Sequence, residues 1–408
     1  MRFSHILIAV MTTLSVFGCM PKKEQNSVTS TTSNVENVVL SPQELMEEAI
    51  FEYDQETFKN FLADNPDIDK NRLLTLAVVV GRPSIMKILL EAGANPNHHP
   101  AEGSLEVNLL FIPSDIRSID VPKLLIDAGT DVHFRTSTGL TALHAAVEVM
   151  DIEKAKLLIR HGVNVEARSL KGNTPLHIAT GRTSTLDYHI ETYIPKDITL
   201  SSEEKKELEQ YLKTAQLDMV SMLLAKGANP NAANKGKLTP LHSAASYGRA
   251  QVVRKLIAHN ASVNLLDGQG WTPLSWAIAS NNLETVQVLL TNGASIKKAT
   301  SPYSSPLHGA VAKGNFEITK VLIERGAKIN HPVMIAADES NFTPLHLAAN
   351  NNFPEIANLL IQKGADVTAK TSKGLTVLDI INERPERIEN FKKSGVFWKI
   401  NDALYNAM

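Results

Sequence analysis

The chain has 408 residues, a length that by itself indicates two or three compact domains. Its formal net charge is −2, which lacks the positive excess of nucleic-acid-binding proteins, so we expect no nucleic-acid partner. Cys19 is the only cysteine, so no disulfide is needed for the fold.

Residues 1–18 have the pattern of a secretory signal peptide. Arg2 precedes an apolar run from Phe3 to Val16, and Gly18 and Cys19 follow. The run is shorter than the roughly 20 residues of a membrane span. An uncleaved anchor, or an ordinary signal with a chance cysteine, is the alternative interpretation. Residues 19–40 are rich in Ser, Thr and Asn and predict a flexible linker.

Residues 44–133 predict three divergent helical pairs. Ser41-Pro42-Gln43-Glu44 has the pattern of a capping box that opens a helix. Two apolar helical patterns follow within each of the segments 44–69, 71–97 and 108–133. Pro113 and Pro122 lie in the third segment, so its first helix is predicted to be distorted.

Residues 138–373 repeat one pattern in a regular way. Each copy begins with an N-cap Thr or Ser and ends its second helix at a residue suited to the left-handed conformation. The copies begin at steps of 33, 65, 33, 33, 38 and 33 residues. They read Thr141-Ala-Leu-His144, Thr174-Pro-Leu-His177, Thr239-Pro-Leu-His242, Thr272-Pro-Leu-Ser275, Ser305-Pro-Leu-His308, Thr343-Pro-Leu-His346 and Thr376-Val-Leu-Asp379.

Two steps are longer than the 33-residue period, and the last segment differs from the repeats before it. The long step places an insert at about 182–216, between the two helices of one pair, and Ser201 to Glu204 predicts a helix that extends the second helix backwards. The step of 38 residues adds five residues at 331–340, in a loop. Residues 374–408 are predicted to form a helical cap.

A period of 33 residues with Thr-Pro-Leu-His is similar to the ankyrin-repeat family over nearly all of the chain after about residue 44. The resemblance implies an all-α ankyrin-repeat solenoid over residues 41–408, with about nine to ten stacked helix-turn-helix units joined by hairpin-like loops. In this family the motif His bonds to its own Thr and to neighbouring backbone. Ser275 and Asp379, which replace it here, are therefore expected to be weaker links.

Val16-Phe17-Gly18-Cys19 resembles the lipobox of bacterial lipoproteins. The resemblance implies that Cys19 is lipidated, with palmitate among its lipids, and becomes the mature N-terminus. The residue after Cys19 is Met20 and not Asp. By the same resemblance, this favours an outer-membrane lipoprotein of the bacterial envelope that faces the periplasm.

The recurrent histidines are the most conspicuous candidates for chemistry. Because successive copies lie one repeat apart, they cannot surround a single zinc ion at about 2 Å, and we interpret them as structural. His98-His99 is the other metal candidate, although such a pair is more commonly an exposed loop. A hidden active site in the insert would need catalytic groups, and Asp187, His189 and Glu191 form the only cluster there. No nucleophile elbow or phosphate loop is present, so we expect no enzyme, no metal and no cofactor.

The resemblance implies that a partner binds to the loop tips and the exposed face of the first helices. Trp271 and Phe342 directly precede the motif, where an aromatic ring either anchors a partner or stacks on the next loop. Trp276, one helical turn further on, is expected in the core. The candidate partner-binding residues are Leu238, Trp271, Phe342, Tyr247, Lys235, Lys237, Gln269 and Tyr303, which share one edge, with Tyr188 and Tyr193 of the insert.

These features predict a monomeric, envelope-anchored protein-interaction module that binds a protein through a concave surface. One specific form is an immunity or inhibitor protein against a toxic effector. The alternative is a scaffold that positions an envelope enzyme, such as one of a stress response.

Overall fold

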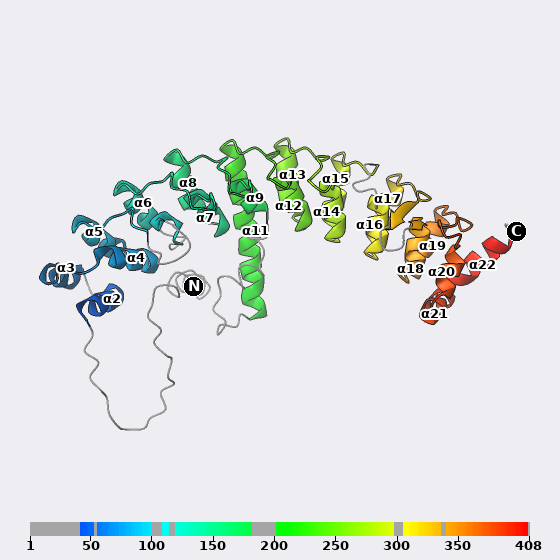
Figure 1. Cartoon of the computed structure of the whole chain (residues 1–408), viewed down its shortest axis with the longest axis horizontal. Coiled ribbons are helices and arrows are strands. Elements are labelled where there is room, and N and C mark those ends of the chain that lie inside the picture. Colours follow the sequence, from blue (N-terminus) through cyan, green and yellow to red (C-terminus); the bar gives the residue numbers. More distant parts are fainter. Residues whose placement is uncertain are drawn as a thin grey trace, which may run out of the picture. The chain divides into compact units, whose positions relative to one another are not determined.

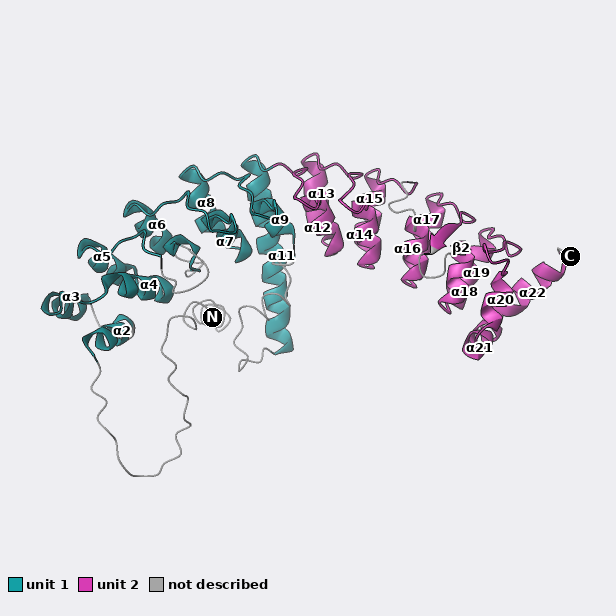
Figure 2. Cartoon of the chain, viewed as in Figure 1, with its two compact units in different colours: residues 1–228 teal, residues 229–408 magenta. Residues whose placement is uncertain are grey.

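The structure, a computed structural model, describes residues 41–52, 55–99, 108–113, 119–181, 201–297, 305–335 and 340–406. Helices make up nearly all of its regular structure, so the predicted all-α class is confirmed (Figure 1). The chain divides into two compact units, residues 1–228 and 229–408 (Figure 2).

Unit 1 consists of helical pairs with one short 3-10 helix. Consecutive first helices contact each other, for example α2 with α4 and α7 with α9. The elements are α2 Pro42–Glu52, α3 Gln55–Asp64, α4 Lys70–Val80, α5 Pro83–Glu91, η1 Leu109–Phe111, α6 Asp120–Asp127, α7 Ala142–Glu148, α8 Ile152–Arg160, α9 Pro175–Thr180 and α11 Ser202–Ala225.

Unit 2 continues the same pairing in its own series. First helices contact first helices from α12 to α20, and second helices contact second helices from α13 to α19. The elements are α12 Pro240–Ser246, α13 Ala250–Ala258, α14 Pro273–Ala279, α15 Leu283–Thr291, α16 Pro306–Ala312, α17 Phe316–Glu324, β1 Val333–Ile335, β2 Ser340–Phe342, α18 Pro344–Asn350, α19 Pro354–Gln362, α20 Val377–Asn382, α21 Pro385–Lys393 and α22 Val396–Asn406.

The repeat at α12 shows why this sequence forms a helical pair. Thr239 is the N-cap of α12 and forms a capping box with His242, while Pro240 occupies the first helical position. Leu241 and Ala244 are fully buried. Gly248 then turns the chain at a φ of 64°, a left-handed conformation that costs a residue with a Cβ about 1–2 kcal/mol.

The predicted ends of the second helices are confirmed. All six carry a positive φ, between 67° and 93°. Asn260, with a φ of 67°, is the one residue among them that is not glycine, and asparagine tolerates this conformation better than most residues do. These residues are Gly162, Gly227, Asn260, Gly293, Gly326 and Gly364.

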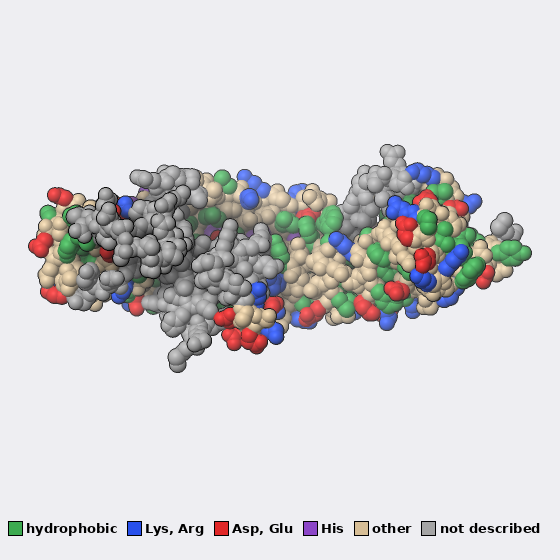
Figure 3. Space-filling model, turned by 90° about the horizontal axis from the view of Figure 1, so that it is seen from below, with side chains coloured by type: hydrophobic (Ala, Val, Ile, Leu, Met, Phe, Trp, Pro, Cys, Tyr) green, Lys and Arg blue, Asp and Glu red, His purple; other side chains and the backbone are tan. Residues whose placement is uncertain are grey.

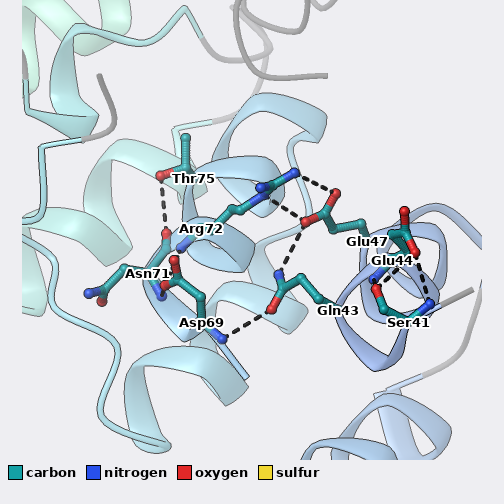
Figure 4. A network of polar contacts seen from close by, with 8 residues as sticks. All are labelled: Ser41, Gln43, Glu44, Glu47, Asp69, Asn71, Arg72 and Thr75. Atoms are coloured by element: carbon teal, nitrogen blue, oxygen red, sulfur yellow. Dashed lines mark hydrogen bonds and ion pairs between the residues drawn. The ribbon is translucent and has the colours of Figure 1, made fainter. Parts of the chain in front are cut away.

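A polar network joins the divergent first pair to the second (Figure 4). Nε of Arg72 on α4 lies 2.7 Å from Oε1 of Glu47 on α2, and Nη2 of Arg72 donates to Glu47 Oε2 at 3.2 Å. Gln43 accepts a hydrogen bond from the backbone N–H of Asp69, the N-cap of α4. The predicted capping box at Ser41 is present, since Ser41 and Glu44 bond reciprocally. The divergent pair is therefore attached by side chains in place of the repeated motif.

The third pair departs most from the pattern, as its prolines predict. Its first helix is reduced, among the described residues, to the 3-10 turn of η1. Asn108 caps this turn and donates from Nδ2 to the carbonyl of Asp131 at 2.7 Å. Lys154 of α8, only 3% exposed, donates from Nζ to the carbonyl of Ile112 at 2.9 Å. Side-chain bonds to backbone thus attach this short turn to the neighbouring segments.

The insert ends in a helix that runs without a break into the second helix of its pair, as predicted. Helix α11 has 24 residues, whereas α8, α13, α15, α17 and α19 each have nine. Ser201 caps it reciprocally with Glu204. Gln216, 1% exposed, donates from Nε2 to the carbonyl of Ala179 and attaches α11 to α9.

The C-terminal segment covers the last repeat. Helix α22 contacts α19, α20 and α21, with Val396 and Ile400 buried. Phe391 is fully buried, as a cap requires. Trp398 differs, since 53% of its surface is exposed on the outer side of α22.

Candidate protein-binding surface

The motif histidines connect each repeat to the next, as the resemblance implies. The backbone N–H of Thr239 donates to Nδ1 of His242 at 3.1 Å. Nε2 of the same ring lies 3.1 Å from the carbonyl oxygens of both Leu265 and Trp271, on the following loop. The corresponding rings of His144, His308 and His346 bond to Asn173, Phe342 and Ala369.

These bonds fix the protonation state of His242. An N–H donor at Nδ1 requires that nitrogen to be unprotonated, and carbonyl acceptors at Nε2 require a proton there. The ring is therefore held neutral. Burial lowers the pKa of His242, and it lowers the pKa values of His144 and His308 to about 4.

The loop whose carbonyls bond to His242 is stabilised by the buried carboxylate of Asp267. Oδ1 of Asp267 accepts the backbone N–H groups of Gln269 and Trp271 at 2.8 and 2.9 Å. Oδ2 accepts the indole Nε1–H of Trp276 at 2.9 Å. Asp267 is only 6% exposed, and these three donors offset the cost of its burial.

Asp267 holds two tryptophans together at the surface of unit 2. The ring centroids of Trp271 and Trp276 lie 5.4 Å apart with an interplanar angle of 49°. Both side chains are half-buried, so each retains a face toward solvent. The expectation that Trp276 lies in the core is wrong, because its side chain is only half-buried, with its indole N–H bonded to Asp267 of the loop.

The neighbouring lysine loop lies directly against this tryptophan loop. The backbone N–H of Gly268 donates to the carbonyl of Gly236 at 2.7 Å. A Cβ at Gly268 would lie 2.9 Å from that oxygen, so the approach needs glycine. Lys235 and Lys237 flank Gly236 and are exposed, as is Gln269 beside Gly268. The structure thus brings together Lys235, Lys237, Leu238, Gln269 and Trp271.

Exposed leucines extend this surface. Leu265 and Leu266, which precede Asp267, are 38% and 44% exposed. Sequence reasoning missed them together with Asp267. The available signal was the position of Asp267 four residues before Trp271, where the loops of other repeats carry Thr136, Ser169 or Thr371 to bond the equivalent N–H.

Phe342 corrects the expected set of contact residues. It lies in β2, pairs with Val333 of β1 and is only 5% exposed. Its ring centroid lies 5.9 Å from that of His346, and its carbonyl accepts Nε2 of His308 at 3.0 Å. Phe342 is therefore a structural residue, and the expectation that it presents its ring to a partner is wrong.

Tyr247 is exposed but does not share the edge of the lysine and tryptophan loops. It follows the last residue of α12, whereas Lys237 precedes the first. The seven residues of α12 separate the two by roughly 10 Å along the helix axis. The other candidates, Tyr303, Tyr188, Tyr193 and Cys19, and the cluster at 187–191, lie outside the described residues.

The described part of the chain contains no cluster of three potential metal ligands among its His, Cys, Asp and Glu residues. His98 and His99 belong to no group of three potential ligands there, and the ring of His99 packs 5.0 Å from that of Phe134. No described helix combines the length and the apolar character needed to cross a bilayer. An open pocket of about 470 Å³ lies between α8 and α11, with Tyr211 and Asp218 in its lining.

Comparison with known proteins agrees with the observed repeats. A sequence model described as "Ankyrin repeats (3 copies)" matches residues 114–193, 210–300 and 297–371, together more than half of the chain. The chain is similar to human ASB11 ankyrin repeat domain, with a TM-score of 0.48 and 23% identity over 62% of this chain and 98% of that one.

Curated relatives match over shorter stretches. Alpha-latrocrustotoxin-Lt1a of Latrodectus tredecimguttatus is 45% identical over 47 residues, which is 12% of this chain and 3% of the toxin. B-cell lymphoma 3 protein homolog of Mus musculus is 27% identical over 185 residues, 44% of this chain and 34% of that protein. Protein phosphatase 1 regulatory subunit 27 of Homo sapiens is 41% identical over 56 residues, 14% and 36% of the two chains.

The chain thus spans at most 36% of the length of these relatives. The sequence model that matches this chain describes ankyrin repeats. This fold typically serves as a non-enzymatic module for protein–protein interaction. The matched residues and the repeated helical pairs establish that this chain belongs to the ankyrin-repeat family.

Proposed function

We propose that unit 2 binds a protein partner through the tryptophan surface, which we define as Leu265, Leu266, Trp271 and Trp276. The observation that supports this choice is the partly exposed tryptophan pair. Asp267 holds it by accepting the backbone N–H of Trp271 and the indole N–H of Trp276, each at 2.9 Å. Large aromatic side chains that are fixed before binding lose little conformational entropy on association, and tryptophan is enriched among the residues that dominate interface energies.

The partner chemistry follows from what surrounds the tryptophans. Leu265 and Leu266, on the same loop as Trp271, add apolar area with 38% and 44% exposure. The polar backbone of the loop is already bonded to Asp267, so a partner need not satisfy it. On the face in Figure 3, hydrophobic side chains lie among backbone and uncharged polar atoms, while many of the charged side chains, of both signs, lie along the margins. Such an arrangement favours a protein surface over a small charged ligand.

The test is capture of the partner by crosslinking followed by mass spectrometry. The double variant Trp271→Ala/Trp276→Ala is expected to lose the captured protein, because it removes both rings. Trp398→Ala on α22 is the matched control, since it removes another exposed tryptophan from the same unit. Equal capture by all three forms would refute the choice of this surface.

We propose further that the chain acts at a bacterial envelope, held by lipid on Cys19. The support is the sequence of residues 1–19. Labelling with radioactive palmitate is expected for the full chain and absent for Cys19→Ala, which should also leave the membrane fraction. A Cys19→Ala form that sediments with membranes to the same extent would contradict the anchor.

Inhibition of a toxic effector at the envelope is the specific role we propose, and tethering of an envelope enzyme is its alternative. Both use the same surface, so the assay is the activity of the captured partner with and without saturating chain. An inhibitor lowers that activity, and the Trp271→Ala/Trp276→Ala variant should restore it. Unchanged activity of the bound partner would favour the tether.

A further inference from the structure

The first three loops of unit 2 carry an unequal set of charges. Lys235 and Lys237 are exposed on the loop before the tryptophan loop, and Lys297 is exposed on the loop after it; none of the three makes an ion pair with a described residue. Asp267 is the one acidic residue on these loops among those described, and it is buried. The loop edge, which we define as Lys235, Lys237, Lys297 and the tryptophan surface, therefore exposes only positive charge.

The negative charge of Asp267 is directed inward. Its carboxylate oxygens accept hydrogen bonds from donors of its own repeat, on Gln269, Trp271 and Trp276. A carboxylate satisfied in this way contributes little attraction at the surface for a basic partner. The lysines beside it, by contrast, extend into solvent.

The second helices of unit 2 do not share this bias. Arg254 on α13 pairs with Glu284 on α15 at 2.9 Å. Helix α17 carries Glu317 and Glu324 together with Lys320. The excess of lysine is thus confined to the loops and is not a property of the whole unit.

We propose that the segment docked on the loop edge is an acidic polypeptide stretch that carries apolar side chains. This proposal rests on the proposed function and names the chemistry of its partner. The apolar side chains contact Trp271 and Leu266, while the carboxylates lie over Lys235, Lys237 and Lys297. Complementary charge of this kind raises the association rate and excludes basic competitors more than it adds affinity.

The direction of the segment follows from the charges along the chain. The fourth connection of unit 2 carries Asp338 and Glu339 in its sequence and so interrupts the positive run of the three loops before it, while the fifth carries Lys370 and Lys373 with Asp366. Gly268 and Gly236 bond at 2.7 Å, which keeps the lysine pair directly beside the tryptophan loop. The acidic part of the partner is therefore placed over Lys235 and Lys237, and its apolar part over Trp271.

The experiment measures fluorescence anisotropy of labelled peptides with the full chain. The first peptide has about 20 residues with Asp and Glu alternating with Leu and Phe. The second replaces each acid by Lys, and the third keeps the acids but replaces Leu and Phe by Ser. We expect binding of the first peptide only, with an affinity that falls as NaCl rises from about 50 to 300 mM.

Charge-reversal variants locate the contact. Lys235→Glu/Lys237→Glu is expected to weaken binding of the first peptide by about tenfold or more, because two attractions become repulsions. Lys320→Glu/Lys363→Glu is the matched control, with the same change of net charge at two exposed lysines of α17 and the end of α19. It should change the affinity less than about twofold.

Two results would overturn the inference. One is binding of the basic peptide as tightly as the acidic one, and the other is an equal loss in both double variants, which would mean attraction by net charge alone. Failure here is separable from failure of the proposed function. A crosslinked partner that depends on Trp271 and Trp276 but binds fully to Lys235→Glu/Lys237→Glu would keep the surface and reject an acidic occupant.

Discussion

Nε2 of His242 lies 3.1 Å from the carbonyl oxygen of Trp271, so the capping-box histidine of one repeat holds the loop that presents the tryptophan of the next. The same ring accepts the backbone N–H of Thr239. Fold and candidate surface are therefore connected through one neutral imidazole. Changes at this ring should affect both stability and the position of Trp271.

Replacing His242 by Ala should destabilise unit 2 by about 2–4 kcal/mol. The change leaves the buried N–H of Thr239 and the carbonyls of the next loop without their partner, and each lost buried bond costs about 1–3 kcal/mol. Urea denaturation with circular dichroism measures the loss. Ser275→Ala is the control at the equivalent position of the next repeat, and it should cost less because a serine has no ring nitrogen to reach that loop.

The folded chain should lose stability as the pH falls from about 6.5 toward 4. Burial lowers the pKa values of His144 and His308 to about 4, so an unfolded histidine binds a proton that the folded one excludes. Each ring contributes a slope of up to about 1.4 kcal/mol per pH unit in this window. Above the pKa of an unfolded histidine, about 6.5, both states hold neutral rings and this loss of stability does not occur.

Chemical denaturation at pH 7.5, 6.0 and 5.0 tests this slope. The double variant His144→Ser/His308→Ser should be less stable at pH 7.5 but should vary less between pH 7.5 and 5.0. The carboxylates with lowered pKa values, such as Asp379, lose their contribution only at lower pH. A wild-type midpoint that stays constant from pH 7.5 to 5.0 would contradict the prediction.

Gly314→Ala should destabilise the chain more than Gly326→Ala does. Both glycines have a positive φ, of 68° and 85°, so each substitution costs about 1 kcal/mol in the backbone. A Cβ at Gly314 would also lie 2.8 Å from Cζ of Phe353, whereas one at Gly326 meets nothing within 4 Å. We expect an additional loss of about 1–3 kcal/mol for Gly314→Ala, measured by thermal unfolding. Equal losses in the two variants would show that Phe353 moves aside freely.

Asp267→Asn should loosen the tryptophan pair. An asparagine has one acceptor oxygen, so it cannot accept both the loop N–H groups and the indole of Trp276. The expected cost is about 1–3 kcal/mol, with tryptophan emission shifted to longer wavelength as Trp276 becomes more hydrated. The measurement is made with Trp398→Phe present, which leaves two of the three tryptophans. Asp402→Asn on the exposed side of α22 serves as the control and should leave the emission unchanged.

The sequence predicted the fold well because its signals are local. N-cap threonines, glycines after the second helices and the capping box at Ser201 each act within a few residues, and the structure confirms them. Asp379 illustrates a partial success. It replaces the motif histidine and still caps Thr376, at 2.7 Å to its hydroxyl. A carboxylate retains the capping half of the histidine role.

The candidate surface was harder to predict because side-chain exposure depends on contacts between loops. Trp271 and Phe342 occupy the same place before their motifs, yet Trp271 is half-buried and Phe342 is 5% exposed. The difference arises from the strand pairing of Val333 with Phe342, which the five added residues make possible. The half-buried position of Trp276 similarly involves a hydrogen bond to a carboxylate nine residues earlier. Periodicity alone carries no information on such pairs.

The continuity of α11 shows how a repeat protein can gain new sequence without losing its packing. The added residues enter between two helices and leave as the first turns of the second one, so Gln216 still reaches Ala179. Growth at the turn of this hairpin therefore leaves the contact between its own two helices intact, and an insertion at such a position need not disturb the pair that carries it.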